Sequence, residues 1–162
     1  MPDYLEKINK VTEEISVDIS KYIIKHMFND SYNDFKPHKI ADLGRYGIAG
    51  LTKIACDLYG CKAIEKYIDR NILKASLYPA IRTKIHEHMH DYLANKCPEL
   101  ILNKELHEAY AEIIPYRWFR KNDPAFAEFW KKTSPYKDLL EGMDKMEGKE
   151  FRKYLPMYKS WS

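Results

Sequence analysis

Residues 79–96 of this 162-residue chain read PAIRTKIHEHMHDYLANK, and their spacing indicates the class of fold. Hydrophobic side chains recur there at steps of three and four residues, at Ile81, Ile85, Met89, Tyr92 and Leu93. Pro79 suits the first turn of a helix, and Pro98 interrupts the pattern. The stretch therefore predicts a helix over residues 79–96 with one apolar face.

The same spacing continues on both sides of this stretch. It predicts helices over residues 3–28, 61–76 and 103–114, and another that begins near Pro37 and ends by Gly60. The chain is 45% hydrophobic and 31% charged, which is typical of a folded domain. We expect an all-α fold, a single helical domain of four or five main helices with an irregular, proline-punctuated C-terminal arm.

Three glycines lie at three-residue steps inside the predicted helix after Pro37, at positions 44, 47 and 50. Each glycine costs a helix about 1 kcal/mol relative to alanine. The segment is therefore either a loop or a helix that another element approaches closely. It lacks the G-x-G step and the preceding strand of a dinucleotide-binding loop, which argues against phosphate binding.

Four prolines divide the last third of the chain, and the sequence predicts a helical domain over 1–114 and an aromatic, basic arm over 115–162. Short helices are expected over 124–133 and 135–147, followed by an extended end. Aromatic residues and arginine are typical anchors of protein interfaces. The predicted partner-binding residues are Tyr116, Arg117, Trp118, Phe119, Arg120, Phe129, Trp130, Tyr158 and Trp161. Packing in the protein's own core and stacking on single-stranded nucleic acid are the alternatives.

The segment His86-Glu87-His88-Met89-His90 satisfies the H-E-x-x-H pattern of zinc peptidases. His86 and His90 are one helical turn apart, the spacing that two ligands of one metal require. A third ligand would come from downstream, and the candidates are Glu105, His107 and Glu108. The simpler interpretation is a polar helix face with no metal, and no second E-x-x-H step exists for a di-iron site.

Other chemistry finds little support in the sequence. The chain has an odd number of cysteines, Cys56, Cys61 and Cys97, and no two of them form a C-x-x-C pair. We therefore expect free structural thiols. We also expect no cofactor. No nucleophile motif, apolar run long enough to span a membrane, or arginine-rich presequence is visible. A net charge of +3 is weak for a nucleic-acid-binding protein.

Several short segments resemble a known family, the small helical matrix-side subunits of the mitochondrial cytochrome bc complex (respiratory complex III). These segments are Tyr46-Gly47-Ile48, Ala63-Ile64 with Lys66, the basic run that ends at His86, and Leu155-Pro156-Met157-Tyr158-Lys159. The chain departs from the family where Ala49-Gly50-Leu51 replaces a pair of acidic residues. The resemblance implies a subunit without catalytic residues or cofactor that packs on other proteins at the inner membrane.

The function expected from the sequence is therefore a non-catalytic accessory subunit of a larger protein complex, most plausibly in the respiratory electron-transport chain. Its partners would be other subunits, and its location intracellular, on the matrix side of the mitochondrial inner membrane. Two alternatives remain open at this point. One is a metal-binding or metal-dependent helical enzyme that uses His86 and His90, and the other is an RNA-associated subunit.

Overall fold

The computed structural model describes residues 2–145, and these form a mixed α/β fold with 66% helix and 16% strand. The expectation of an all-α fold is therefore wrong, because three strands lie between the first helix and the helix that carries the histidines. The elements are α1 (Pro2–Phe28), β1 (His38–Ala41), η1 (Gly44–Tyr46), β2 (Gly50–Asp57), β3 (Gly60–Asp69), α2 (Arg70–Ala75), α3 (Leu77–Lys96), η2 (Pro98–Leu102), α4 (Lys104–Asn122), α5 (Pro124–Lys132) and α6 (Lys137–Met143).

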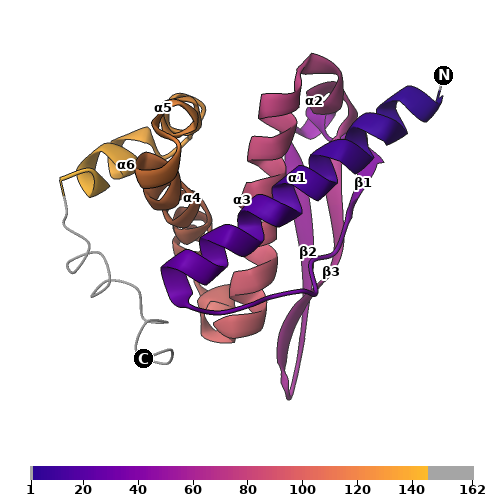
Figure 1. Ribbon diagram of the computed structural model, residues 1–162. Coiled ribbons are helices and arrows are strands. Elements are labelled where there is room, and N and C mark those ends of the chain that lie inside the picture. The colour runs from indigo at the N-terminus through magenta and orange to yellow at the C-terminus, as the bar shows by residue number, and fades with distance from the viewer. Residues whose placement is uncertain (1, 146–162) are drawn as a thin grey trace.

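Helix α3 is the centre of the molecule. The sheet lies on one side of it, α4, α5 and α6 lie on the other, and α1 crosses it (Figure 1). Because it contacts α1, β2, β3 and α4, most of its side chains are buried, the charged ones included. The helix predicted over 79–96 is thus confirmed, with its start two residues earlier.

The sheet has the strand order β1-β3-β2, with β1 parallel and β2 antiparallel to β3. Strands β2 and β3 form a hairpin whose turn is Leu58-Tyr59, and both of these side chains are almost fully exposed. Among the described strands, β2 pairs on one side only and is therefore an edge strand. Its first half lies against α3, where Thr52 bonds to Glu87.

A disulfide joins Cys56 to Cys61, so the prediction of free thiols is wrong for this pair. The two residues are directly opposite each other in the β2–β3 register. A spacing of five residues suits two cysteines that flank a tight hairpin turn, where their Cα atoms come within bonding range, here 4.1 Å. Cys97 is a free, buried thiol, as expected.

The two helices predicted between Pro37 and residue 76 are also wrong for most of their length. The glycine-spaced segment is a short 3-10 turn followed by Gly47 with a φ of 70°, a conformation that suits glycine and ends the turn. The carboxylate of Asp69 holds this turn in place by accepting from the backbone N–H groups of Leu43 and Gly44, each at 2.9 Å. Only the end of the second predicted helix is helical, as α2.

Helix α4 continues through Pro115 to Asn122, although the sequence predicted a stop at this proline. Proline removes one backbone hydrogen bond from a helix interior. Burial of its neighbours, Ile114 and Tyr116, compensates for this loss. The side chains of Asn103 and Asp123 cap the starts of α4 and α5 by accepting hydrogen bonds from the backbone N–H groups of Leu106 and Phe126.

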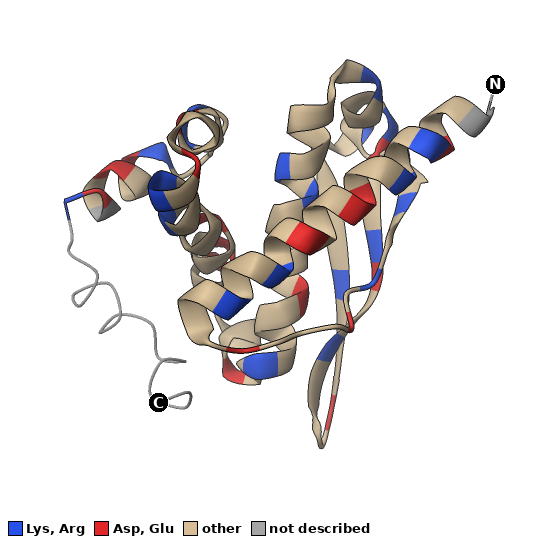
Figure 2. Ribbon diagram, viewed as in Figure 1, with Lys and Arg blue, Asp and Glu red and all other residues tan. Residues whose placement is uncertain are grey.

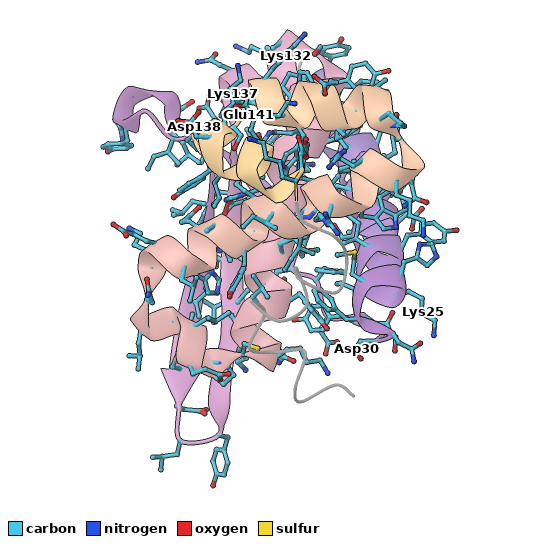
Figure 3. All side chains as sticks on the ribbon, turned by 90° about the vertical axis from the view of Figure 1, so that its left-hand side faces the viewer. Lys25, Asp30, Lys132, Lys137, Asp138 and Glu141 are labelled. Carbon is cyan, nitrogen blue, oxygen red and sulfur yellow. A yellow bond between two sulfur atoms is a disulfide. The ribbon has the colours of Figure 1, made fainter. Side chains whose placement is uncertain are left out.

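The largest hydrophobic cluster joins α1, α3, α4 and α5, and it includes much of the predicted aromatic arm. Tyr116, Phe119 and Trp130 are at most 3% exposed there. Figure 2 shows charges of both signs over α5 and α6, and Figure 3 shows Lys132, Lys137, Asp138 and Glu141 close together on this side. None of the described helices is long and apolar enough to cross a membrane.

Candidate metal centre

Three side chains from α3 and α4 converge on one point. His86 and His90 are one turn apart on α3, and their Nε2 atoms lie 3.0 Å from each other. The carboxylate of Glu108 on α4 reaches both rings, with Oε2 3.0 Å from His86 Nε2 and Oε1 3.1 Å from His90 Nε2. Of the three downstream candidates, the structure therefore selects Glu108.

The donor set fits a zinc ion. Zinc binds imidazole nitrogen and carboxylate oxygen at about 2.0–2.2 Å in a tetrahedron, whose ligand atoms are then about 3.3 Å apart. The three observed separations are within a few tenths of an ångström of this value. Two imidazoles and one carboxylate leave a fourth position for water or substrate, as in catalytic rather than structural zinc sites.

Glu87 follows the first histidine and lines the same cleft. Its Oε2 lies 4.0 Å from His86 Nε2, and its Oε1 accepts a hydrogen bond of 2.9 Å from Thr52 on the edge strand β2. It is only 5% exposed. A carboxylate beside the metal position is placed to take a proton from a bound water molecule.

A carboxylate and an arginine support His86 from behind. Glu112, one turn after Glu108 on α4, has its Oε1 2.8 Å from His86 Nδ1. Arg82 holds both oxygens of Glu112 in a bidentate pair at 2.7 and 2.6 Å, and Ser134 donates to Oε2 at 2.7 Å. The negative charge beside Nδ1 favours a proton on that atom, which leaves Nε2 to bind a metal.

The second ring, His90, has a histidine as its partner. Its Nδ1 lies 2.5 Å from Nδ1 of His107, the residue that precedes Glu108 on α4. His107 is 4% exposed, and burial, together with the neighbouring His90, lowers its pKa to about 4. It is therefore a neutral ring at physiological pH.

A histidine that binds a metal is neutral, but without a metal the site favours the protonated, positively charged ring of His86. Burial disfavours the charged ring, but hydrogen bonds to Glu108 and Glu112 outweigh burial and raise the pKa of His86 to about 10. The same contacts hold the pKa values of both carboxyl groups well below the usual range, against the effect of their burial. The two carboxylates thus form an anionic site that favours a cation between them.

A cleft of about 870 Å³ opens onto these groups. The edge strand β2 and the turn before it form one wall, and α4 and α5 with the segment after α5 form the other. Apart from the site residues, the lining is mostly apolar, with Ile48, Leu51, Ile54, Ile72, Pro79, Ile101, Phe129 and Pro135. The centre is therefore accessible from solvent through a mainly apolar cleft.

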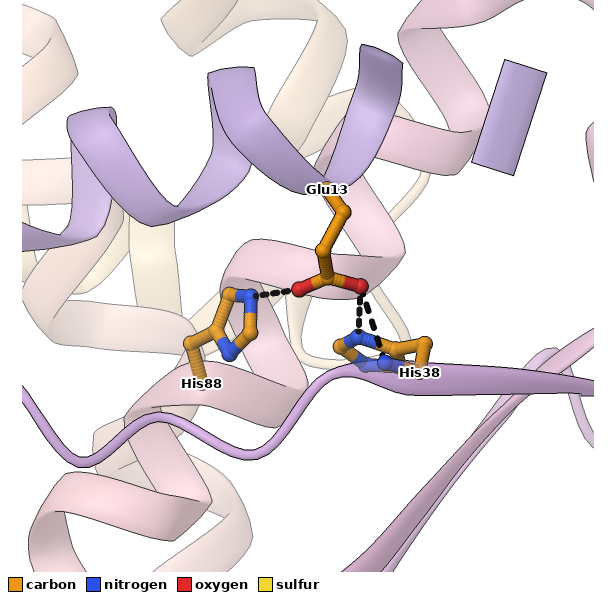
Figure 4. A group of neighbouring side chains, drawn as sticks. All are labelled: Glu13, His38 and His88. Carbon is orange, nitrogen blue, oxygen red and sulfur yellow. Dashed lines mark hydrogen bonds and ion pairs between the residues drawn. The ribbon is translucent and has the colours of Figure 1, made fainter. Parts of the chain in front are cut away.

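A second polar cluster lies on the opposite side of α3, where Glu13 of α1 meets His38 of β1 and His88 of α3 (Figure 4). His38 donates to Oε1 of Glu13 from its backbone N–H and lies 2.9 Å from the same oxygen through Nδ1, and His88 Nε2 lies 2.9 Å from Oε2. Although two histidines and a carboxylate could bind a metal, the neighbouring charges argue against this.

Two buried lysines already compensate the negative charge of that cluster. The ammonium of Lys66 lies 2.6 Å from both His88 Nδ1 and the carboxylate of Asp91, and Lys84 lies 3.4 Å from Glu13. Because an ammonium only donates, His88 accepts at Nδ1 and carries its proton on Nε2, which lies 2.9 Å from Oε2 of Glu13. The cluster is thus a network of two cations and two anions that fastens α1 and the sheet to the middle of the histidine helix.

The structure places the predicted partner-binding residues in three kinds of surroundings. Tyr116, Phe119 and Trp130 pack in the protein's own core, and Phe129 lines the cleft. Arg117 and Trp118 are half-buried, with Trp118 Nε1 donating to His26, and the exposed Arg120 pairs with Asp144. Tyr158 and Trp161 lie outside the described residues.

Comparison with known proteins gives no further assignment. No protein family model, curated protein or solved structure matches the chain. What is known about the site therefore comes from its own geometry.

Proposed function

We propose that this protein is a metal-dependent hydrolase of peptide bonds, with zinc as the preferred ion. His86, His90 and Glu108 are the ligands, and Glu87 is the general base. The observation that carries the proposal is the convergence of these ligand atoms within 3.1 Å of one another, with the carboxylate of Glu87 farther away, its Oε2 4.0 Å from His86 Nε2. This combination is what the H-E-x-x-H pattern requires in zinc peptidases.

When bound, the ion supplies a Lewis acid that lowers the pKa of a water molecule and polarises a carbonyl group. Glu87 accepts the proton of that water and, as an acid, returns it to the leaving nitrogen. The hydrogen bond from Thr52 orients the carboxylate of Glu87. Glu112 and His107 hold the rings of His86 and His90 in the ligand orientation.

A peptide substrate is favoured by the edge strand along the cleft. Residues 50–52 and Ile54 of β2 line the cleft, and β2 pairs with β3 on only one of its two sides. The free side presents backbone N–H and C=O groups to which an extended peptide can add as a strand. Such a peptide would pass directly in front of Glu87 and the metal ligands.

The test is hydrolysis of unfolded casein by protein freed of metal with a chelator and then supplied with zinc. We expect cleavage only with zinc, and a loss of about 10²- to 10⁴-fold in the Glu87→Gln variant, which should bind zinc as tightly as the wild type. Glu141→Gln, at an exposed position of α6, is the matched control. Cleavage that persists in Glu87→Gln would contradict the assignment of the base.

The accessory-subunit role in a respiratory complex stays a prediction, as does the RNA-associated role. The first rests on the resemblance of several short segments and on the aromatic arm, and the second on the aromatic arm alone, whereas the metal centre rests on contacts between described side chains. Migration of the native protein with a complex of several hundred kilodaltons in a mild detergent extract would support the first of these roles.

A further inference from the structure

The contact between His90 and His107 has an unusual geometry. The two ring planes are parallel to within 3°, with centroids 4.7 Å apart, yet the Nδ1 atoms lie only 2.5 Å from each other. Rings stacked face to face could not bring two nitrogens this close, because their van der Waals thickness keeps them apart. The rings therefore meet edge to edge, and a single hydrogen bond in the plane of both joins the two Nδ1 atoms.

This hydrogen bond contains one proton, which is bonded to Nδ1 of either His90 or His107. Metal binding to His90 determines which of the two atoms carries it. A neutral histidine that binds a metal through Nε2 must carry its proton on Nδ1. His90 then donates, and Nδ1 of His107 can only accept. A neutral His107 with a bare Nδ1 must in turn carry its own proton on Nε2.

The Nε2 atom of His107 is buried and has no hydrogen-bond partner among the described residues. A buried N–H without an acceptor costs about 1–3 kcal/mol, so such groups call for an explanation. His107 belongs to the wall of the cleft that contains the metal ligands. An oxygen atom of a molecule bound in that cleft can supply the acceptor that the described residues lack.

We infer that His107 is a positioning residue that couples metal binding to substrate binding. Metal on His90 fixes His107 as the Nε2–H tautomer, and this N–H donates to a carbonyl oxygen of the peptide in the cleft. The inference rests on the proposed metal site and adds a second, metal-controlled donor to it. In the metal-free protein the shared proton can belong to either ring, and the donor is not fixed.

Nitrogen-15 NMR of the histidine rings tests the first half on the wild-type protein, with zinc alone as the probe. Protonated and bare ring nitrogens have widely separated shifts. With zinc bound, we expect Nδ1 of His107 to be bare and Nε2 to be protonated. A protonated Nδ1 on His107 in the zinc-loaded protein would overturn the inference while leaving the metal site intact. Failure of the wild type to bind zinc would overturn both.

Two variants separate the roles of the two ring nitrogens. In His107→Asn the side-chain oxygen can accept from His90 where Nδ1 does, but no group replaces the Nε2–H. In His107→Leu both are lost. We expect the leucine variant to bind zinc about 10- to 100-fold more weakly, and the asparagine variant to recover most of this loss.

The zinc-saturated asparagine variant should still hydrolyse peptides about two- to tenfold less efficiently in kcat/KM, which is the effect of one neutral hydrogen bond. If His107→Leu binds zinc as tightly as the wild type, His107 does not position His90. If zinc-loaded His107→Asn has the kcat/KM of the wild type, His107 does not donate a hydrogen bond to the substrate. The NMR result stands independently if either variant fails to fold.

Discussion

Glu13 has three polar partners: its carboxylate lies 2.9 Å from a ring nitrogen of His38 and of His88, and 3.4 Å from the ammonium of Lys84. Lys84 is fully buried and also donates to Asn9 and Thr12. Its burial lowers its pKa to about 8 despite the attraction of Glu13. Removal of the carboxylate therefore leaves a buried positive charge without its counter-charge.

We predict that Glu13→Ala lowers the free energy of unfolding by about 3–5 kcal/mol, the usual effect of breaking a buried ion pair on one side. Urea unfolding of the metal-free protein would measure this loss. Glu14→Ala is the matched control, since Glu14 is the next residue of α1 and is exposed. Equal losses in the two variants would show that the network contributes little to stability.

The same residue predicts how stability depends on pH. Burial opposes ionisation of Glu13, but hydrogen bonds from His38 and His88 outweigh burial and hold its pKa far below the usual range. A carboxyl group with a lowered folded-state pKa stabilises the fold above its unfolded pKa of about 4.3, and this contribution is lost as pH falls below that value. Between pH 7 and pH 3.5, the wild type should therefore lose more stability than Glu13→Gln. A parallel loss in both proteins would contradict this account.

The sequence predicted part of the metal centre at the residue scale. The H-E-x-x-H pattern identified His86 and His90, and Glu108 was among three proposed third ligands. Glu112 was missed, although its spacing of one helical turn from Glu108 is visible in the sequence. Arg82 could not be predicted, because its role depends on how α3 and α4 pack.

At the scale of elements, the close approach of β2 to α3 depends on Gly50. A Cβ atom at this position would lie 2.7 Å from the side chain of Thr83 and 3.1 Å from Cγ of Glu87. Both neighbours are on α3, and Glu87 also bonds to Thr52 of β2. The glycine thus lets the edge strand lie directly against the proposed general base.

We predict that Gly50→Ala lowers kcat for peptide hydrolysis by about tenfold or more, since small displacements of reacting groups have effects of this size. Zinc affinity should change little, because none of the three atoms nearest to the added Cβ belongs to a proposed ligand. Gly142→Ala is the control, with no atom within 4 Å of the added Cβ. An unchanged kcat in Gly50→Ala would show that hydrolysis does not depend on the close approach of β2 to Glu87.

The strands were missed for a reason that is visible in β3. Its buried residues Cys61, Ala63, Lys66 and Ile68 do not alternate strictly, because a register shift against β2 adds one residue between Ala63 and Glu65, and one of the four is a lysine. The isoleucine spacing there resembles that of a helix. Lys66 is buried only because Asp91 and His88 of α3 pair with it, and this pairing is a property of the tertiary structure.

At the scale of the whole molecule, α3 joins two halves that face each other across the cleft. The edge strand β2 contributes the substrate-facing wall, and α4 contributes the third ligand and the partners of both histidine ligands. A bound ion would therefore tie α3 to α4. The disulfide between Cys56 and Cys61 links β2 to β3 next to the hairpin turn, away from these ligands.

The predicted division into residues 1–114 and 115–162 can be compared with this arrangement. Residue 115 lies inside α4, and Tyr116 and Phe119 pack in the same cluster as α1 and α3. Of the four prolines that suggested the boundary, Pro124 marks the start of α5. The proline pattern did not predict that Pro115 lies inside a helix, because this depends on how the neighbouring residues pack.

Zinc stoichiometry tests the central proposal most directly. Metal-free protein is dialysed against micromolar zinc at pH 7.5, and bound metal is measured by mass spectrometry of the elements. We predict one zinc ion per chain in the wild type and in Glu87→Gln, and none in the double variant His86→Ala, His90→Ala. A wild type without zinc, or a double variant that binds it equally well, would contradict the metal centre.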